Sequence, residues 1–180
     1  LETVREYGQV RLVEAGEVEA ARQAHAAFFR HLAEDAQPQI DGRRATEWLE
    51  RLDAESDNLR LALDWHQAEG EGGRAEDGLR LVSALWRFWY FRGYWTEARA
   101  RLEALLGRAP ARTVVRAWGL LAAGSFAAEQ GDYAAAQRFQ DEALAIYREL
   151  GDRGGLGRAL HRLGTIAFAA SGAVLGVRKG

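Results

Sequence analysis

The amino-acid sequence predicts an all-α protein in which antiparallel helical hairpins stack into a solenoid. Apolar residues recur at helical spacing along most of the chain, and no segment shows the sustained period-two alternation of a half-buried strand. The strong helix formers Ala, Leu, Glu and Arg dominate the composition. A motif with the length of a two-helix hairpin also recurs along the sequence, and this repetition predicts that successive hairpins pack on one another.

Residues 117–152 contain the clearest copy of this motif. Small residues at Gly124 and Ala136 allow two antiparallel helices to approach closely. Gly131 permits a tight turn between them, and Asp132 is placed to cap the second helix. The other positions of the motif are Leu120, Ala123, Ala127, Tyr133, Ala143, Leu144 and Tyr147.

Further copies of the motif lie on both sides of this hairpin. An offset of 38 residues aligns Trp86, Trp89, Gly93, Trp95 and Ala98 with Gly124, Ala127, Gly131, Tyr133 and Ala136. An offset of 40 residues aligns Leu160, Leu163, Gly164 and Ala167 with Leu120, Ala123, Gly124 and Ala127. The pattern resembles the tetratricopeptide repeat, a helix–turn–helix unit of about 34 residues, and the resemblance implies a right-handed α-solenoid.

The alignment of the copies also predicts which side chains are buried. We expect burial of Trp86, Trp89, Leu120, Ala127, Leu160 and Ala167, and an inward position for Phe88, which aligns with Phe126. Arg80, Arg87 and Glu129 are expected to be accessible. Tyr90 and Phe91 map to the face that lines the groove in repeats of this kind, where an exposed aromatic residue indicates recognition.

Two N-terminal segments resemble a family of large bacterial regulators. Residues 1–7 resemble the segment that closes the winged-helix part of these proteins, and residues 48–65, which include Asp57-Asn58-Leu59-Arg60, resemble the hairpin that opens their repeat region. The family consists of signal-transduction ATPases with numerous domains, among them LuxR-type, MalT-like and AfsR-like transcriptional regulators. Related architectures carry a nucleotide cyclase instead of a DNA-binding domain. The resemblance extends to about Ala170, although Gly8 stands where relatives usually have Ala.

We expect four parts in the chain. Residues 1–15 are the end of a winged-helix segment or a linker helix, residues 16–74 are a hairpin outside the repeat consensus, residues 75–170 are tetratricopeptide-like repeats with the third incomplete, and residues 171–180 are an irregular tail, truncated or divergent. Eight helices are expected, over residues 1–15, 17–36, 44–68, 75–92, 95–106 and 154–170, with two more in residues 117–152. Because Met is absent, we expect the sequence to be a piece of a longer protein.

Composition excludes several classes of function. The formal net charge of −2 provides no basic footprint for nucleic acid, and no segment is long and apolar enough to span a bilayer. No secretory signal opens the chain, and the absence of Cys excludes disulfides and thiolate metal sites. These features are typical of a cytoplasmic protein.

No residue pattern indicates catalysis, a cofactor or a metal. Asp53, Glu55, Asp57 and Asp64 are spaced like calcium-loop ligands, but Asn58 stands where such a loop needs Gly, so a solvated helix face is expected. Asp57 and Asn58 are instead expected to make a local polar contact that fixes the hairpin. The histidines, namely His25, His31, His66 and His161, do not form a metal-ligand pair on one helix face. A nucleophile elbow and a phosphate-binding loop are also absent.

A candidate binding groove follows from the positions that face inward in a stack of first helices. Its members are Arg80, Ser83, Arg87, Tyr90, Trp118, Leu121, Ser125, Glu129, Arg158, His161 and Thr165. Arg80, Arg87 and Arg158 could hold a carboxylate or phosphate through paired hydrogen bonds, or they are solvated arginines on a polar face.

The expected function is a non-catalytic protein-interaction or effector-sensing module of a bacterial multidomain transcriptional regulator. A protein, a peptide or a small effector would bind in the groove, and the resemblance implies ATPase and output domains in the same parent chain. The alternatives are the regulatory arm of a signalling enzyme such as a nucleotide cyclase, or a free-standing protein-binding scaffold.

Overall fold

The computed structural model describes residues 2–68, 72–161, 163 and 164, and within these residues it contains helices and no strand. The helices with defined bounds are α1 (Glu2–Ala15), α2 (Val18–Ala36), α3 (Ala45–Ala54), α4 (Ser56–Gln67), α5 (Gly72–Ala84), α6 (Trp86–Arg92), α7 (Trp95–Arg108), α8 (Val114–Glu129) and α9 (Tyr133–Leu150). Residues 153–161 are helical as well. The prediction of an all-α fold is confirmed.

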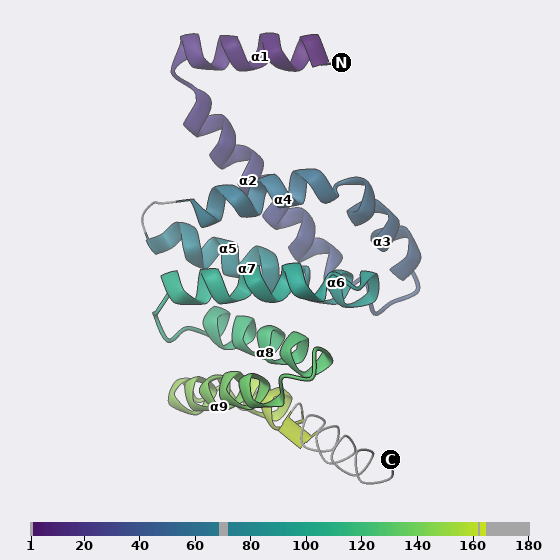
Figure 1. The fold of residues 1–180 in the computed structure, drawn as a ribbon, viewed down its shortest axis with the longest axis vertical. Coiled ribbons are helices and arrows are strands. Elements are labelled where there is room, and N and C mark those ends of the chain that lie inside the picture. Colours follow the sequence, from purple (N-terminus) through teal and green to yellow (C-terminus); the bar gives the residue numbers. More distant parts are fainter. Residues whose placement is uncertain (1, 69–71, 162, 165–180) are drawn as a thin grey trace.

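The helices pack as successive antiparallel pairs (Figure 1). Helix α2 packs on α4, α5 packs on α7, and α8 makes the most extensive contact of the molecule with α9. The first helices of these pairs also touch in order, α2 against α5 and α5 against α8. Helix α1 lies apart from the stack, and its main contact is with α2.

Two predicted helices are bent where continuous helices were expected. The helix expected over residues 44–68 is divided at Glu55, and the one expected over residues 75–92 is divided at Leu85. Both residues have ψ near zero, at 9° and −5°, instead of the helical value near −42°. At the first bend the Ser56 hydroxyl donates to the carbonyl oxygen of Leu52 over 3.2 Å, a back-bond that commonly bends helices.

Helix α8 is the centre of the core. Its residues Ala117 and 119–127 are all buried, so the helix is enclosed on every side along residues 119–127. Helix α9 covers it from within the same hairpin, and α5 and α7 cover it from the preceding one. Because no side of α8 can face water without exposing apolar surface, this helix requires neighbours in two directions.

The close approach predicted at Gly124 is confirmed. A Cβ atom on this glycine would lie 2.6 Å from Nε2 of Gln140 and 3.2 Å from the backbone oxygen of Ala136. Gln140 and Ala136 belong to α9 and are fully buried. The α8–α9 crossing therefore depends on the absence of a side chain at residue 124.

The predicted turn between α8 and α9 is also confirmed. Gly131 has a φ of +78°, a conformation that L-residues with side chains rarely adopt. A carboxylate oxygen of Asp132 accepts a hydrogen bond of 3.0 Å from the backbone N–H of Ala135, which caps α9. The aligned glycine of the preceding hairpin, Gly93, has a φ of +75°, so both turns follow the same local rule.

The predicted burial pattern is confirmed at most positions of the two complete hairpins, and it is wrong at Arg87 within them and at Leu160 beyond them. Trp89, Leu120, Ala127, Phe88 and Phe126 are buried, Trp86 is partly buried against the core, and Arg80 and Glu129 are exposed. Arg87 is half-buried rather than accessible, because Asp41 and two aromatic rings surround it. Leu160 is 51% exposed, whereas burial was expected.

The difference at Leu160 has a simple packing reason. Its aligned residue Leu120 is covered by α9, whereas no second helix in the described part of the chain covers Leu160. The predicted burial of Ala167, the irregular tail at residues 171–180 and the end of the helix expected over residues 154–170 lie outside the described residues.

Substitution of Gly124 by Leu is expected to destabilise the fold. The new side chain would collide with α9 at Gln140 and Ala136, and overpacking of this kind costs about 1–3 kcal/mol. Chemical denaturation monitored by circular dichroism measures the loss. Gly107→Leu is the matched control, because Gly107 is exposed near the end of α7 and has open space around its Cβ position. Equal stability of the two variants would contradict the role of Gly124.

Candidate functional site

The predicted groove residues lie on three first helices of the stack. Arg80 belongs to α5, Arg87 and Tyr90 belong to α6, and Trp118, Ser125 and Glu129 belong to α8. Arg158 and His161 lie in the helical residues 153–161, and both are exposed. Thr165 lies outside the described residues. Because α5 packs on α8, Arg80 lies on a helix adjacent to the one that carries Trp118, Ser125 and Glu129.

The three arginines proposed as an anion clamp each have a separate carboxylate neighbour. Arg80 is 3.7 Å from Glu76 and 3.9 Å from Asp77 on its own helix. Arg158 is 3.9 Å from Asp152. Arg87 forms an ion pair with Asp41, which lies in the connection between α2 and α3. Shared binding of one anion by all three arginines therefore stays a prediction.

One pair of predicted groove residues is directly joined. The Tyr90 hydroxyl donates a hydrogen bond of 2.7 Å to a carboxylate oxygen of Glu129, which links α6 to α8. Nearby on α8, Ser125 is buried and donates to the carbonyl oxygen of Leu121 over 2.8 Å. Ser83 and Leu121 are buried too, so the accessible part of the predicted groove is narrower than the sequence indicated.

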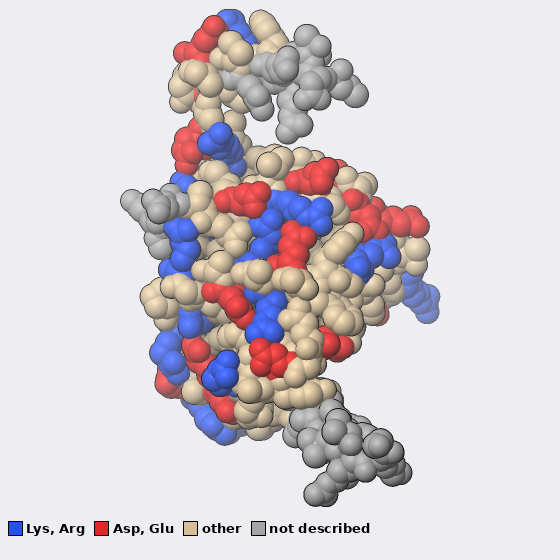
Figure 2. Space-filling model, in the orientation of Figure 1, with Lys and Arg blue, Asp and Glu red and all other residues tan. Residues whose placement is uncertain are grey.

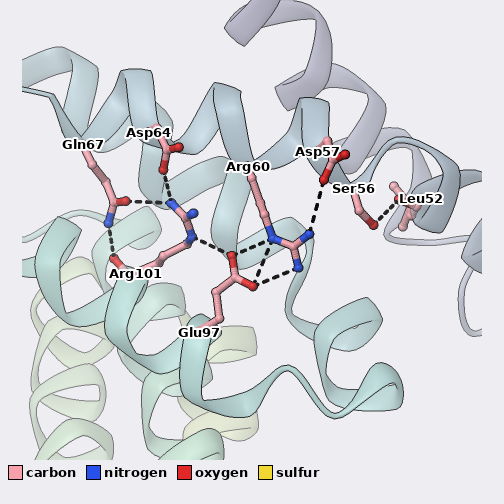
Figure 3. Close-up of polar contacts among 8 residues, drawn as sticks. All are labelled: Leu52, Ser56, Asp57, Arg60, Asp64, Gln67, Glu97 and Arg101. Atoms are coloured by element: carbon pink, nitrogen blue, oxygen red, sulfur yellow. Dashed lines mark hydrogen bonds and ion pairs between the residues drawn. The ribbon is translucent and has the colours of Figure 1, made fainter.

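The second helices of the hairpins are joined by an ion-pair network that the sequence analysis did not find (Figure 3). Glu97 of α7 accepts hydrogen bonds of 3.0–3.2 Å from Arg60 of α4 and one of 3.1 Å from Arg101 of its own helix. Arg101 continues the network to Asp64 and Gln67 of α4, each at 2.8 Å. Two hairpins are thus connected by bidentate, charge-assisted contacts.

This network changes the titration of Glu97. Burial alone raises the pKa of its carboxyl group, but the hydrogen bonds from Arg60 and Arg101 favour the ionised form and bring the pKa below its ordinary value. The carboxylate is therefore held charged between two guanidinium groups. Arg60 responds in the opposite direction, and its pKa is raised chiefly by the same hydrogen bond.

Arginine–carboxylate contacts continue along the rest of the stack. Arg99 of α7 pairs with Asp132 at 2.6 Å, Arg116 of α8 pairs with Glu142 at 2.8 Å, and Arg112 pairs with Glu149 at 2.6 Å. On the face shown in Figure 2, basic and acidic groups alternate, and neither forms a broad patch of one sign. The visible surface therefore offers no extended field of the kind that attracts nucleic acid.

The Asp57-Asn58 contact expected from the sequence is present in part. The Asn58 amide donates to Glu55 over 2.7 Å, a local contact at the α3–α4 bend. Asp57 is fully exposed and lies 3.8 Å from Arg60. The residue of this segment that joins two hairpins is Arg60, and its position opposite Glu97 at the start of α7 gave no local signal in the sequence.

The carboxylates spaced like calcium ligands are engaged elsewhere. Asp53 pairs with Arg92, Glu55 with Asn58, and Asp64 with Arg101. Among the described residues, no group of three or more His, Asp or Glu side chains is arranged to hold a metal ion. None of the helices in that part of the chain combines the length and apolar character needed to cross a bilayer.

His66 is the one deeply buried histidine among the described residues. It is 3% exposed, and its Nδ1 lies 3.0 Å from the carbonyl oxygen of Arg74, which makes Nδ1–H the donor. Burial lowers the pKa of His66, so the imidazole is neutral near pH 7. The ring links the end of α4 to α5 and has the surroundings of a structural residue.

Comparison with known proteins relates this all-helical chain to a class of regulators. It is 30% identical over 177 residues to "Putative HTH-type transcriptional regulator Rv0890c" of Mycobacterium tuberculosis strain H37Rv, and a protein of the same description in Mycobacterium bovis matches equally. The match covers 91% of this chain and 19% of each relative. The chain therefore spans about a fifth of the length of these curated relatives. No family model and no solved structure matches it.

Replacement of Glu97 by Gln is expected to weaken the contact between α4 and α7. The variant loses charge-assisted hydrogen bonds from two arginines, and because the network is partly solvated the expected cost is about 1–2 kcal/mol at pH 7. Glu103→Gln on the same helix is the control, since Glu103 contacts Arg99 of its own helix at 2.7 Å. Urea denaturation of both variants measures the difference, and equal losses would contradict a special role for Glu97.

The same variant is expected to change the pH dependence of stability. Because the folded-state pKa of Glu97 lies below its ordinary value of 4.5, its contribution is complete above pH 4.5 and is lost as the pH falls through the lower, folded-state pKa. The parent chain should therefore lose more stability on acidification below pH 4.5 than Glu97→Gln does. Parallel pH-dependent curves for the two proteins would contradict the assignment.

Proposed function

We propose that this chain is a non-catalytic protein-interaction or effector-sensing module of a bacterial multidomain transcriptional regulator. The observation that carries the proposal is the match to HTH-type transcriptional regulators, which includes 91% of the chain but only 19% of each relative. High coverage of this chain and low coverage of each relative are what we expect if the chain is one module of a larger protein. The names of the relatives favour a transcriptional regulator over the alternative of a nucleotide cyclase.

We further propose that the module is a right-handed solenoid of tetratricopeptide-like hairpins. Three features support it: the first helices α2, α5 and α8 touch in sequence order, the second helices α4 and α7 are joined by an ion-pair network, and equivalent glycines form the turns at Gly93 and Gly131. Residues 1–15 would lead from a winged-helix segment, and residues 16–74 would open the repeat region.

In this proposal the working surface is the face formed by the first helices. A protein, peptide or small effector bound there would favour one packing of the hairpins over another and so affect the attached ATPase and output domains in the cytoplasm. Such an effect requires unequal affinity for two arrangements of the stack. The fragment itself would bind no nucleic acid and no membrane.

Exchange of the matching segment in the M. tuberculosis regulator would test the proposal. In the chimera, this chain replaces the aligned residues of the regulator. We expect the chimera to retain regulated transcription from its target promoters in a reporter assay. The same chimera with Gly124→Leu should lose regulation because the hairpin is disrupted, and Gly107→Leu should retain it. Unchanged transcription after deletion of the whole segment would contradict a regulatory role.

The purified chain is expected to hydrolyse neither ATP nor simple ester or phosphate substrates. Its carboxylates and arginines are largely paired with one another, as at Glu97 with Arg60 and Arg101, and serve to hold helices together. A coupled assay for phosphate release measures turnover. Activity that disappears on substitution of one of the chain's own residues would contradict the non-catalytic assignment.

A further inference from the structure

Helix α6 separates its side chains onto two faces. Phe88 and Trp89 are 1% and 3% exposed and belong to the core. Trp86, Arg87 and Tyr90 are half-buried on the other side, and Phe91 is 52% exposed. We call these last four residues the α6 face. Three aromatic rings and one cation thus lie on a single short helix, which follows α5 directly in the chain.

The aromatic rings surround the charge of Arg87. The guanidinium carbon lies 5.2 Å from the centroid of the Trp86 ring and 5.7 Å from that of Phe91, within the range of cation–π contact. The Nε atom of Arg87 is buried and has no hydrogen-bond partner. A planar guanidinium can donate two parallel hydrogen bonds to one carboxylate, and the partly exposed Arg87 side chain can offer its two Nη atoms in this way.

Carboxylates from neighbouring elements approach the α6 face from two sides. Asp41, whose side chain is 52% exposed, pairs with Arg87 through Nη2. Glu129 of α8 accepts the hydrogen bond of the Tyr90 hydroxyl at 2.7 Å. In this state both polar side chains of the face hold carboxylates of the chain itself, which shows the chemistry that the surface accepts.

We propose that the α6 face binds a carboxylate-bearing peptide segment of a partner protein, and that Asp41 is an internal competitor for Arg87. A carboxylate of the partner would take the place of Asp41 at Nη2 of Arg87. An apolar residue beside that carboxylate would pack on Phe91. This inference rests on the proposed role of the chain as an interaction module and identifies the ligand chemistry of its first-helix side.

Release of Asp41 requires little of the surrounding structure. The adjacent Ile40 is 3% exposed and anchors the connection between α2 and α3 in the core. The backbone of this connection is also fixed by turn hydrogen bonds, such as that from Gly42 N–H to the oxygen of Gln39 at 3.0 Å. The exposed Asp41 side chain can therefore rotate into solvent while its backbone stays in place.

A peptide titration tests the proposal. The probe is a fluorescein-labelled peptide, Ala-Glu-Phe-Glu-Ala with blocked ends, compared with the same peptide carrying Gln in place of Glu. Asp41→Asn should bind the acidic peptide about two- to fivefold more tightly than the parent chain, the range expected for removal of an exposed competing ion pair. The Gln peptide should bind neither protein measurably better than buffer controls.

Matched variants locate the effect. Asp53→Asn is the control. It removes a partly exposed carboxylate that pairs with Arg92, another arginine of α6, and should leave peptide affinity unchanged. Asp41→Asn combined with Arg87→Gln should lose binding, and Asp41→Asn combined with Phe91→Ala should weaken it. Because Phe91 is exposed, this second variant tests the face even where loss of Arg87 disturbs the fold.

Three results would overturn the inference: equal affinity of Asp41→Asn and the parent, equal binding of the Glu and Gln peptides, or full binding after substitution of both Arg87 and Phe91. These results are separate from the chimera experiment, which depends on the hairpin stack and not on Arg87. A chimera that regulates while the peptide fails to bind would remove only the ligand assignment.

Discussion

The enclosure of α8 is the constraint on which the rest of the structure depends. A helix that is buried along Ala117 and residues 119–127 cannot be stable beside a single partner, because one side would leave apolar surface in water. Helix α9 satisfies one side at the close Gly124 crossing, and α5 and α7 satisfy the other. The stack is therefore cooperative at its centre, since loss of either neighbouring element would expose α8.

Polar contacts then connect the layers that this burial brings together. The Arg60–Glu97–Arg101 network joins α4 to α7, and Arg99–Asp132 continues the connection toward α9. Contacts of this kind between partly exposed groups add modest stability but strong geometric preference, because the guanidinium fork accepts a carboxylate in few orientations. The second helices thus form a fixed side of the stack. The first-helix side carries links of this kind as well. Arg30–Asp77 and Arg74–Glu19 join α2 to α5, and Asp41–Arg87 and Tyr90–Glu129 hold α6.

The exposed part of α6 bears on the proposed regulatory role. A module that transmits binding must hold its layers in register while part of its surface remains available to a partner. Helix α6 meets the second requirement, since its inward residues Phe88 and Trp89 fix it in the core while Phe91 is exposed. The chain is similar to HTH-type transcriptional regulators along about a fifth of their length, which agrees with the proposed role.

Much of the architecture was determined by the sequence alone. Helical spacing predicted the all-α fold, and the aligned positions predicted the Gly131–Asp132 turn, the Gly124 crossing and the burial of Trp89, Leu120 and Phe126, because these features depend on local conformation or on one neighbouring helix. The contacts of the candidate site were harder to predict from the sequence. Asp41 and Arg87, or Arg60 and Glu97, are far apart in the sequence, and solvated charges on helix surfaces carry no periodic signal for their partners. Leu160 shows the same limit for apolar residues: its pattern predicted burial, but burial depends on which neighbouring helix packs on that face, and none of the described helices covers it.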